Sequence, residues 1–475
     1  MKERPVRPVT GETSEEMHFF VFVVPLKAQF SPVSSVSPAF ALSIKSGLAK
    51  RHATADSQPD YLSESHQRTG IPKMTDKSRT PVIVSAARTP IGKFLGGLSP
   101  LSAPELGAIV IREALKRANV APEAVEDVIM GQVIQGGTGQ APARQAALKS
   151  GVPATVSALT INKVCGSGLK AVMLAAQAIK AGDKQVIVAG GQESMSNAPY
   201  YVYGMRNGVK LGDQQMVDGM IKDGLWCASC NVHMGSHAEH TATKAKIPRL
   251  EQDEFAAESH RKAIQAIYNG KFKDEIVPVE IAGKKGTTVI DTDEGPRKDT
   301  TVETLGKLRP AFPGKGDNKD LSVTAANASS LNDGASALVV VSEEYAEAHN
   351  IPILARITGY ATGATEPQEL FFAPIFAVQN LMNQTGKKIS DYDLIEANEA
   401  FASQALADGA GLGWDWSRVN VNGGAIALGH PIGASGARVL TTLLYAMKDR
   451  GARTGLATLC LGGGDAVALS VERPG

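Results

Sequence analysis

The hydrophobic positions of this chain alternate between short apolar runs and longer stretches with helical spacing. The runs richest in β-branched residues predict strands, and the clearest are 82–84, 185–189, 338–341, 456–459 and 466–471. The run at 338–341 is apolar without alternation, as expected for a strand covered on both faces. Leu169, Val172 and Ile179 recur at helical spacing and predict a helix just after Cys165. This alternation indicates an α/β fold of packed layers.

One part of the pattern occurs twice. Segments 166–172 (Gly-Ser-Gly-Leu-Lys-Ala-Val) and 433–439 (Gly-Ala-Ser-Gly-Ala-Arg-Val) have similar sequences rich in small residues. Each is followed by an apolar helix, a polar turn and a strand that ends in glycines. The repeat predicts two similar α/β halves separated by an irregular, mixed-charge insert, and inserted loops often hold ligands. The expected organisation is a leader at 1–77, an N-terminal half at 78–200 completed by 321–345, a loop domain at 201–320 and a C-terminal half at 346–475.

The leader resembles a transit peptide only in part. Residues 27–55 contain basic residues and many serines but no acidic residue. Several glutamates, among them Glu12 and Glu15, precede this stretch, although transit peptides avoid them, and Met74 stands directly before the first predicted strand. We therefore expect a dispensable leader and a cytoplasmic protein, with mitochondrial import as the alternative.

Composition narrows the classes of function. The formal net charge is +1, so nothing favours nucleic acid as a partner. Four cysteines among 475 residues do not form a secreted disulfide framework and favour a reducing compartment. The apolar run at 19–24 is far shorter than the roughly 20 residues that cross a bilayer. These features predict a soluble protein with no membrane partner.

Three residues suited to covalent acyl transfer stand among glycines. Cys165 lies at a predicted strand-to-helix junction, where a helix N-terminus and exposed N–H groups can lower the pKa of a thiol. His430, in Gly-His-Pro-Ile-Gly, is a candidate general base or oxyanion donor. Cys460 ends a predicted strand and precedes three glycines; from its own surroundings, a structural role is equally compatible.

Four segments together resemble the signature blocks of the thiolase family. They are 162–168 (Asn-Lys-Val-Cys-Gly-Ser-Gly), 398–402 (Asn-Glu-Ala-Phe-Ala), 429–433 (Gly-His-Pro-Ile-Gly) and 460–464 (Cys-Leu-Gly-Gly-Gly). They occur in the family's order, the likeness covers 78–472, and it is nearest to the acetyl-CoA acetyltransferases. The resemblance implies an α/β thiolase fold: two similar βαβαβ-type halves in a layered α/β/α/β/α arrangement with an inserted loop domain.

The resemblance also implies a reaction, the reversible Claisen condensation of two acetyl-CoA molecules into acetoacetyl-CoA and CoA. Cys165 would carry the acetyl group, His430 would take its proton, and Cys460 would remove an α-proton from the second acetyl-CoA. His430 and a water held by Asn398 would stabilise the enolate, and the N–H groups of Cys165 and Gly462 would form a second oxyanion hole. CoA is substrate and product, and no cofactor or metal is required.

Further family positions fall in the insert and after it. The residues that the resemblance assigns to CoA contacts are Leu225, His233, Met234, Arg297, Thr304, Phe312, Ala325 and Ser329. Thr304 replaces a common serine, the stretch between Phe312 and Leu321 is longer than usual, and residues 370–372 are expected to shape the acyl pocket. A degradative 3-ketoacyl-CoA thiolase is the nearest alternative, and a non-catalytic acyl-CoA-binding protein is an alternative from another class.

Two further expectations concern the insert. Cys227 and Cys230 form a Cys-x-x-Cys that the family lacks; because one pair cannot complete a tetrahedral zinc site, we expect incidental thiols in an exposed loop. The apolar residues Met216, Met220 and Ile221 are expected to be exposed and to contribute to a homodimer or homotetramer contact.

Overall fold

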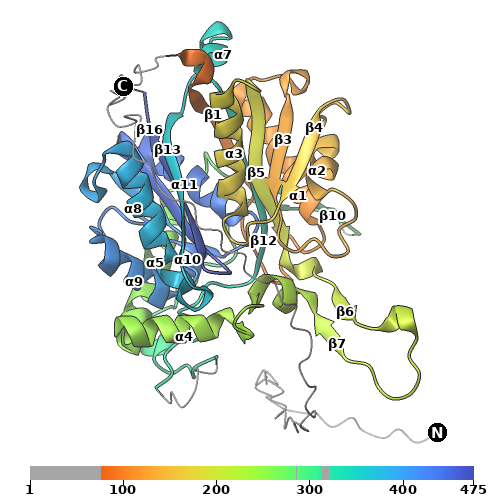
Figure 1. Ribbon diagram of the computed structural model, residues 1–475, viewed down its shortest axis with the longest axis vertical. Coiled ribbons are helices and arrows are strands. Elements are labelled where there is room, and N and C mark those ends of the chain that lie inside the picture. The colour runs from red at the N-terminus through yellow and green to blue at the C-terminus, as the bar shows by residue number, and fades with distance from the viewer. Residues whose placement is uncertain (1–75, 285, 313–319, 475) are drawn as a thin grey trace, which may run out of the picture. The chain divides into compact units, whose positions relative to one another are not determined.

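The computed structural model describes residues 76–284, 286–312 and 320–474, so the predicted leader up to residue 75 and the long stretch at 313–319 lie outside the described residues. The central element is a mixed sheet whose strands come from both halves of the chain (Figure 1). In the described part of the chain, no helix has the length and apolar character needed to cross a membrane.

The N-terminal part of the sheet has the strand order β4-β3-β5-β12-β1, with the short β2 on β12. Its strands are β1 (Pro81–Arg88), β2 (Gly92–Lys93), β3 (Asp127–Gly131), β4 (Ser157–Ile161), β5 (Val186–Ser194) and β12 (Asn332–Ser342). β4, β3 and β5 run parallel, whereas β12 is antiparallel to both of its neighbours. Every residue of β12 is buried, which confirms the prediction of a strand covered on both faces.

The C-terminal part has the order β13-β16-β15-β14. Its strands are β13 (Ala355–Ala364), β14 (Leu394–Ala397), β15 (Thr454–Leu461) and β16 (Asp465–Glu472). β13 pairs with β1 through two residues, Ile83 opposite Ala355 and Val82 opposite Arg356, and this pairing joins the two parts. The order β3-β5-β12-β1 is repeated as β14-β15-β16-β13, with the same parallel and antiparallel pairings, so the predicted internal repeat is present in the strand topology.

Helices cover both faces of the sheet. Those of the two halves are α1 (Ala103–Ala118), α2 (Pro142–Ser150), α3 (Ser167–Ala181), α7 (Glu343–Ala348), α8 (Ala373–Thr385), α9 (Ala402–Leu412), α10 (Ala425–Leu428) and α11 (Ser435–Arg450). α1 and α2 pack on one face of the N-terminal strands. α3 and α11, the two helices of the repeat, pack against each other and against strands of both halves in the largest apolar core. This core therefore brings the two repeated loops that precede α3 and α11 together.

Glycines allow the close approach of α3 and α11. A Cβ atom added at Gly436 would lie 2.3 Å from the backbone nitrogen of Leu169 on α3, and one added at Gly168 would lie 2.6 Å from the backbone nitrogen of Ala437 on α11. Backbone atoms cannot swing away as a flexible side chain can, so only glycine fits at these two positions.

The insert is more regular than predicted. Its described residues form three two-stranded hairpins and three α-helices, besides a short 3-10 helix and a π-helical turn at Met220–Leu225. The hairpins and α-helices are β6 (Tyr200–Val202) with β7 (Met216–Asp218), β8 (Trp226–Cys227) with β9 (Val232–His233), β10 (Val279–Gly283) with β11 (Gly286–Ile290), then α4 (Met234–Ala245), α5 (Arg249–Tyr268) and α6 (Val302–Leu305). The β6–β7 hairpin projects away from the sheet (Figure 1). Met216 and Ile221 are exposed as predicted, but the prediction for Met220 is wrong, because its side chain packs into an apolar cluster with Ile134 and Ile432.

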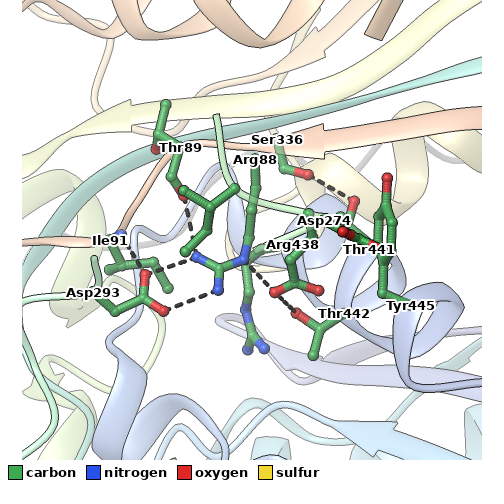
Figure 2. Close-up of polar contacts among 12 residues, drawn as sticks. Arg88, Thr89, Ile91, Asp274, Asp293, Ser336, Arg438, Thr441, Thr442 and Tyr445 are labelled. Atoms are coloured by element: carbon green, nitrogen blue, oxygen red, sulfur yellow. Dashed lines mark hydrogen bonds and ion pairs between the residues drawn. The ribbon is translucent and has the colours of Figure 1, made fainter. Parts of the chain in front are cut away.

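A buried arginine ties the insert to the sheet. Arg88, at the end of β1, donates two hydrogen bonds to the carboxylate of Asp293, at 2.7 and 2.9 Å, and one to Glu275 at 2.6 Å. Figure 2 shows the paired arrangement of the Arg88 guanidinium and the Asp293 carboxylate, which also accepts the backbone N–H of Ile91. All three charged side chains are almost fully buried, so this network fixes both ends of the segment that carries the β10–β11 hairpin, at Glu275 and Asp293, against β1.

Candidate active site

Residues from all four signature blocks meet at one cavity of about 730 Å³. Cys165, His430, Cys460 and Gly462 all line it, although they are separated by almost 300 positions in the chain. Cys165 precedes α3, His430 precedes α11, and Cys460 and Gly462 lie at the end of β15. The volume falls within the range of small-molecule sites, typically 300–1,000 Å³.

Cys165 stands on a strained turn between β4 and α3. Val164 has φ = 46°, a left-handed conformation that is costly for a β-branched residue. The Asn162 side chain accepts the N–H of Val164 at 3.0 Å, and the Ser167 hydroxyl donates to the carbonyl of Val164 at 2.6 Å. These hydrogen bonds hold the turn so that Cys165 faces the cavity at the N-terminus of α3, as the sequence predicted.

The environment of Cys165 disfavours the thiolate before substrate binds. Burial raises the pKa of its thiol to about 11, while hydrogen bonds from the backbone N–H groups of Gly462 and of Cys165 itself act in the opposite direction. Burial also raises the pKa of the Cys460 thiol well above its usual value, and the nearby Cys165 adds to this shift. The expected lowering of the Cys165 pKa is therefore outweighed by desolvation, and both cysteines are thiols at neutral pH.

His430 is held in the form that can accept a proton. Its Nδ1 lies 2.7 Å from the hydroxyl of Ser435, which itself donates to the carbonyl of Pro431 at 2.9 Å. Because the single hydroxyl proton is used there, Ser435 accepts from Nδ1–H, and the lone pair of the imidazole lies on Nε2. Burial, with a smaller contribution from Arg438, lowers the pKa of His430 to about 3, so the ring is neutral.

Asn398 and His430 each present unpaired polar atoms. Among the described residues, no hydrogen-bond partner is available to Nε2 of His430 or to either amide atom of Asn398, although all three atoms are buried. Buried polar groups without partners are rare and cluster at functional sites, where a water or ligand satisfies them. Asn398 does not line the cavity itself, so its amide is suited to act through a water.

The residues assigned to CoA contacts from the sequence fall into two groups. Seven of them line the cavity: Leu225, His233, Met234, Arg297, Phe312, Ala325 and Ser329. The ring of His233 stacks on Phe312 with centroids 4.9 Å apart. Thr304 lies outside the cavity lining; it is exposed on α6, where its hydroxyl accepts the N–H of Thr301.

Of the three residues expected to shape the acyl pocket, 370–372, only two line the cavity. Leu370 and Phe371 line the cavity and pack with Cys460 in an apolar cluster. Phe372 instead lies beneath the ammonium group of Lys244, 5.3 Å from its ring centroid, and does not line the cavity. The wall beside Cys460 is therefore formed by Leu370 and Phe371.

Two buried glutamates position the catalytic blocks and were missed in the sequence. Glu193, at the end of β5, accepts the N–H groups of Gly433 and Val133, both at 2.9 Å. Glu399 accepts from the hydroxyl of Ser259 at 2.7 Å and from the side chain of Asn420 at 2.8 Å. The sequence held a weak signal for both residues, because Glu193 comes four residues after the predicted strand 185–189 and Glu399 comes two residues after β14.

Comparisons with known proteins agree with this geometry. Residues 81–344 match the family model of the thiolase N-terminal domain, and residues 351–473 match that of the thiolase C-terminal domain. Two proteins named acetyl-CoA acetyltransferase, from Pseudomonas aeruginosa and Cupriavidus necator, are each 55% identical over 393 residues, which is 82% of this chain and 99% of each relative. The crystal structure of the Bacillus anthracis acetyl-CoA acetyltransferase superimposes with a TM-score of 0.81 at 42% identity, covering 83% of this chain and 99% of that one.

Proposed function

Because this chain belongs to the thiolase family, we propose that it is an acetyl-CoA C-acetyltransferase, which condenses two acetyl-CoA molecules reversibly into acetoacetyl-CoA and free CoA. The observation that carries the proposal is that Cys165, His430 and Cys460 line one cavity. Among the described residues, Nε2 of His430 has no hydrogen-bond partner, so it can accept a proton. The Pseudomonas and Cupriavidus relatives, which this chain matches over nearly their whole length, are named for this activity.

In the first half-reaction, Nε2 of His430 takes the proton of the Cys165 thiol as the sulfur attacks the thioester carbonyl. The N–H groups of Cys165 and Gly462, both directed at the sulfur, stabilise the negative oxygen of the tetrahedral intermediate. The bond to the CoA sulfur then breaks, and the leaving thiolate takes the proton of Cys460. The products are S-acetyl-Cys165, free CoA and a Cys460 thiolate.

In the second half-reaction, the Cys460 thiolate removes an α-proton from a second acetyl-CoA. The enolate oxygen is stabilised by the protonated Nε2 of His430 and by a water bound to Asn398. The carbanion attacks the acetyl group on Cys165, and collapse of the intermediate releases acetoacetyl-CoA. His430 returns its proton to Cys165, so every group regains its starting state without a metal or other cofactor.

We extend the proposal to the length of the acyl group, the oligomeric state and the location of the protein. The apolar wall of Leu370 and Phe371 beside Cys460 suits a short acyl group, in line with acetoacetyl-CoA and a role in fatty acid metabolism. Tyr203, Leu211 and Met216 on the projecting hairpin are exposed apolar side chains, which favours a homodimer or homotetramer. We place the protein in the cytoplasm.

The test is thiolysis of a ketoacyl-CoA series from acetoacetyl-CoA to long chains, with free CoA as the second substrate. Turnover restricted to acetoacetyl-CoA, and lost in Cys165→Ala, is the expected result. Mass spectrometry after mixing the wild type with acetyl-CoA should find the acetyl group on the peptide that contains Cys165 and not on the peptide that contains Cys227 and Cys230. Preference for longer chains would make the enzyme a degradative thiolase, and no turnover would contradict the catalytic proposal.

A further inference from the structure

Three potential metal ligands meet in the insert, outside the catalytic blocks. Cys227, Cys230 and His237 each offer one ligand atom, and these atoms lie within 4.8 Å of one another. The expectation of incidental thiols in an exposed loop is wrong for Cys227, which is only 3% exposed. Two thiols and an imidazole are ligand types that Zn²⁺ prefers, and in a tetrahedral zinc site such atoms lie roughly 3.5–3.8 Å apart.

The backbone around the first two residues is arranged as a binding turn. Cys227 lies in β8 opposite Val232 of β9, and the connecting turn closes with the N–H of Asn231 donating to the carbonyl of Cys227 at 2.8 Å. The N–H of Cys230 donates to the sulfur of Cys227 at 3.3 Å. A hydrogen bond to sulfur stabilises the thiolate, which is the form that binds a metal.

The third residue comes from a different element. His237 lies in the first turn of α4, which begins directly after β9, and its side chain is 2% exposed. Cys230 is half-buried, so one side of the cluster opens towards solvent. An ion could therefore reach the cluster from the side of Cys230, where solvent can supply a fourth ligand.

We propose that Cys227, Cys230 and His237 bind one Zn²⁺ ion, with a water completing the tetrahedron. The ion would link the β8–β9 hairpin to α4, the two elements that supply His233 and Met234 to the cavity wall. Its role is to hold this wall in place, and it takes no part in acyl transfer. Metal binding here does not depend on the proposed function, so either proposal can fail alone.

The four cysteines of the chain allow a matched test with the full-length protein. The reduced, chelator-treated chain is titrated with Co²⁺ and then with Zn²⁺, and absorption and metal content are measured. We expect one cobalt per chain with a thiolate-to-metal charge-transfer band, displaced by zinc. The double variant Cys165→Ser, Cys460→Ser should keep this band, whereas Cys227→Ser, Cys230→Ser should lose it, although each pair removes two thiols.

Two further measurements test the role of His237 and keep the proposal testable even if the cysteine variants fail to fold. His237→Gln should weaken zinc binding, whereas His240→Gln, one turn further along α4 and hydrogen-bonded to Glu369, should not. In the wild type, zinc should protect the half-buried Cys230 from maleimide, and a chelator should remove this protection without any mutation. The proposal is overturned if no stoichiometric metal is bound, if the Cys227/Cys230 variant keeps the metal, or if these two residues form a disulfide in the metal-treated chain.

Discussion

Cys165 and Cys460 are both thiols, since burial raises the pKa of each, and the imidazole of His430 is neutral with its lone pair on Nε2. In the proposed reaction the nucleophile is therefore formed only as the proton moves from Cys165 to His430, and it is not stored beforehand as an ion pair. This arrangement differs from cysteine enzymes whose thiol pKa is depressed to roughly 3.5–7.5.

The protonation state of Cys165 can be tested by alkylation. A raised pKa means that the thiolate fraction at any given pH is smaller than for a free cysteine. We expect the rate of Cys165 modification by iodoacetamide, followed by peptide mass spectrometry, to rise continuously up to about pH 10. The same peptide in the urea-unfolded chain should level off near the usual cysteine pKa of about 8.5. A plateau near neutral pH in the folded enzyme would contradict this account.

Ser435 is expected to control the tautomer of His430. Ser435→Ala removes the acceptor of Nδ1–H, which supports both the ring orientation and the imidazolium formed in the reaction. Loss of a hydrogen bond to a charged group costs about 1.5–3 kcal/mol, so kcat should fall about 10- to 100-fold with little change in KM.

The matched control is Ser336→Ala, which also removes a buried hydroxyl, hydrogen-bonded to Thr441 at 2.9 Å, away from the cavity lining. It should lower the melting temperature and leave kcat near the wild-type value. Equal losses of kcat in the two variants would show that Ser435 acts only through general packing.

The residues that line the cavity around Cys165 could largely be picked out from the sequence, because Cys165, His430 and Cys460 stand in short, glycine-rich blocks. Cys165 and His430 were placed correctly at helix entries, since local patterns determine where a helix starts. Glu193 and Glu399 could not be assigned from these blocks, because their partners lie far away in the chain and become neighbours only after packing. The burial that raises the pKa of Cys165 likewise depends on the folded cavity and not on adjacent residues.

At the scale of elements, the repeat explains why the two loops meet. α3 and α11 occupy equivalent places in the two halves, and their glycines let the backbones touch near the helix N-termini. The small residues of 166–168 and 433–436, noted in the sequence as a faint repeat, thus have a packing role in addition to exposing the backbone near Cys165 and His430.

A single methyl group should disturb this helix contact. Gly436→Ala would place Cβ 2.3 Å from a backbone atom of α3, and overpacking of this kind costs about 1–3 kcal/mol or more. We expect a lower denaturation midpoint in urea together with reduced activity. In Gly306→Ala, at an exposed helix end, the new Cβ would come no nearer than 3.3 Å to another atom, the carbonyl oxygen of Val302, so this variant should change neither. An unchanged midpoint for Gly436→Ala would mean that the helices can separate without cost.

The insert was the least predictable part among the elements. α5 is a 20-residue helix whose charged residues and alanines give weak apolar periodicity, so the sequence suggested irregular structure. Its helical state depends on packing against α9 and α10, elements more than 130 residues further along the chain. Met220 was mistaken for a surface residue for the same reason: its partner Ile432 belongs to the C-terminal half.

At the scale of the whole molecule, the Arg88 network fastens the insert to the first strand of the sheet. Asp293→Ala leaves the buried guanidinium with only part of its compensating charge, and breaking such a pair typically costs about 3–5 kcal/mol. Lys77→Ala removes an exposed ion pair with Glu347, which solvent screens, so the urea midpoint should stay close to the wild-type value. Urea denaturation of both variants measures the difference, and similar losses would show that burial adds nothing to the Arg88 pair.

The position of β1 has a consequence for the newly made protein on the ribosome. Both neighbours of β1 in the sheet, β12 and β13, come from the chain beyond residue 331, about 240 residues after β1 ends. At about 5–20 residues per second, this strand waits roughly 12 to 50 seconds for a partner. During that time its unpaired N–H and C=O groups, next to apolar side chains, are an aggregation hazard, whereas β3, β4 and β5 can already pair with one another. Nascent chains stalled before residue 332 should therefore be bound by chaperones at residues 81–88, and those stalled beyond residue 364 should release them.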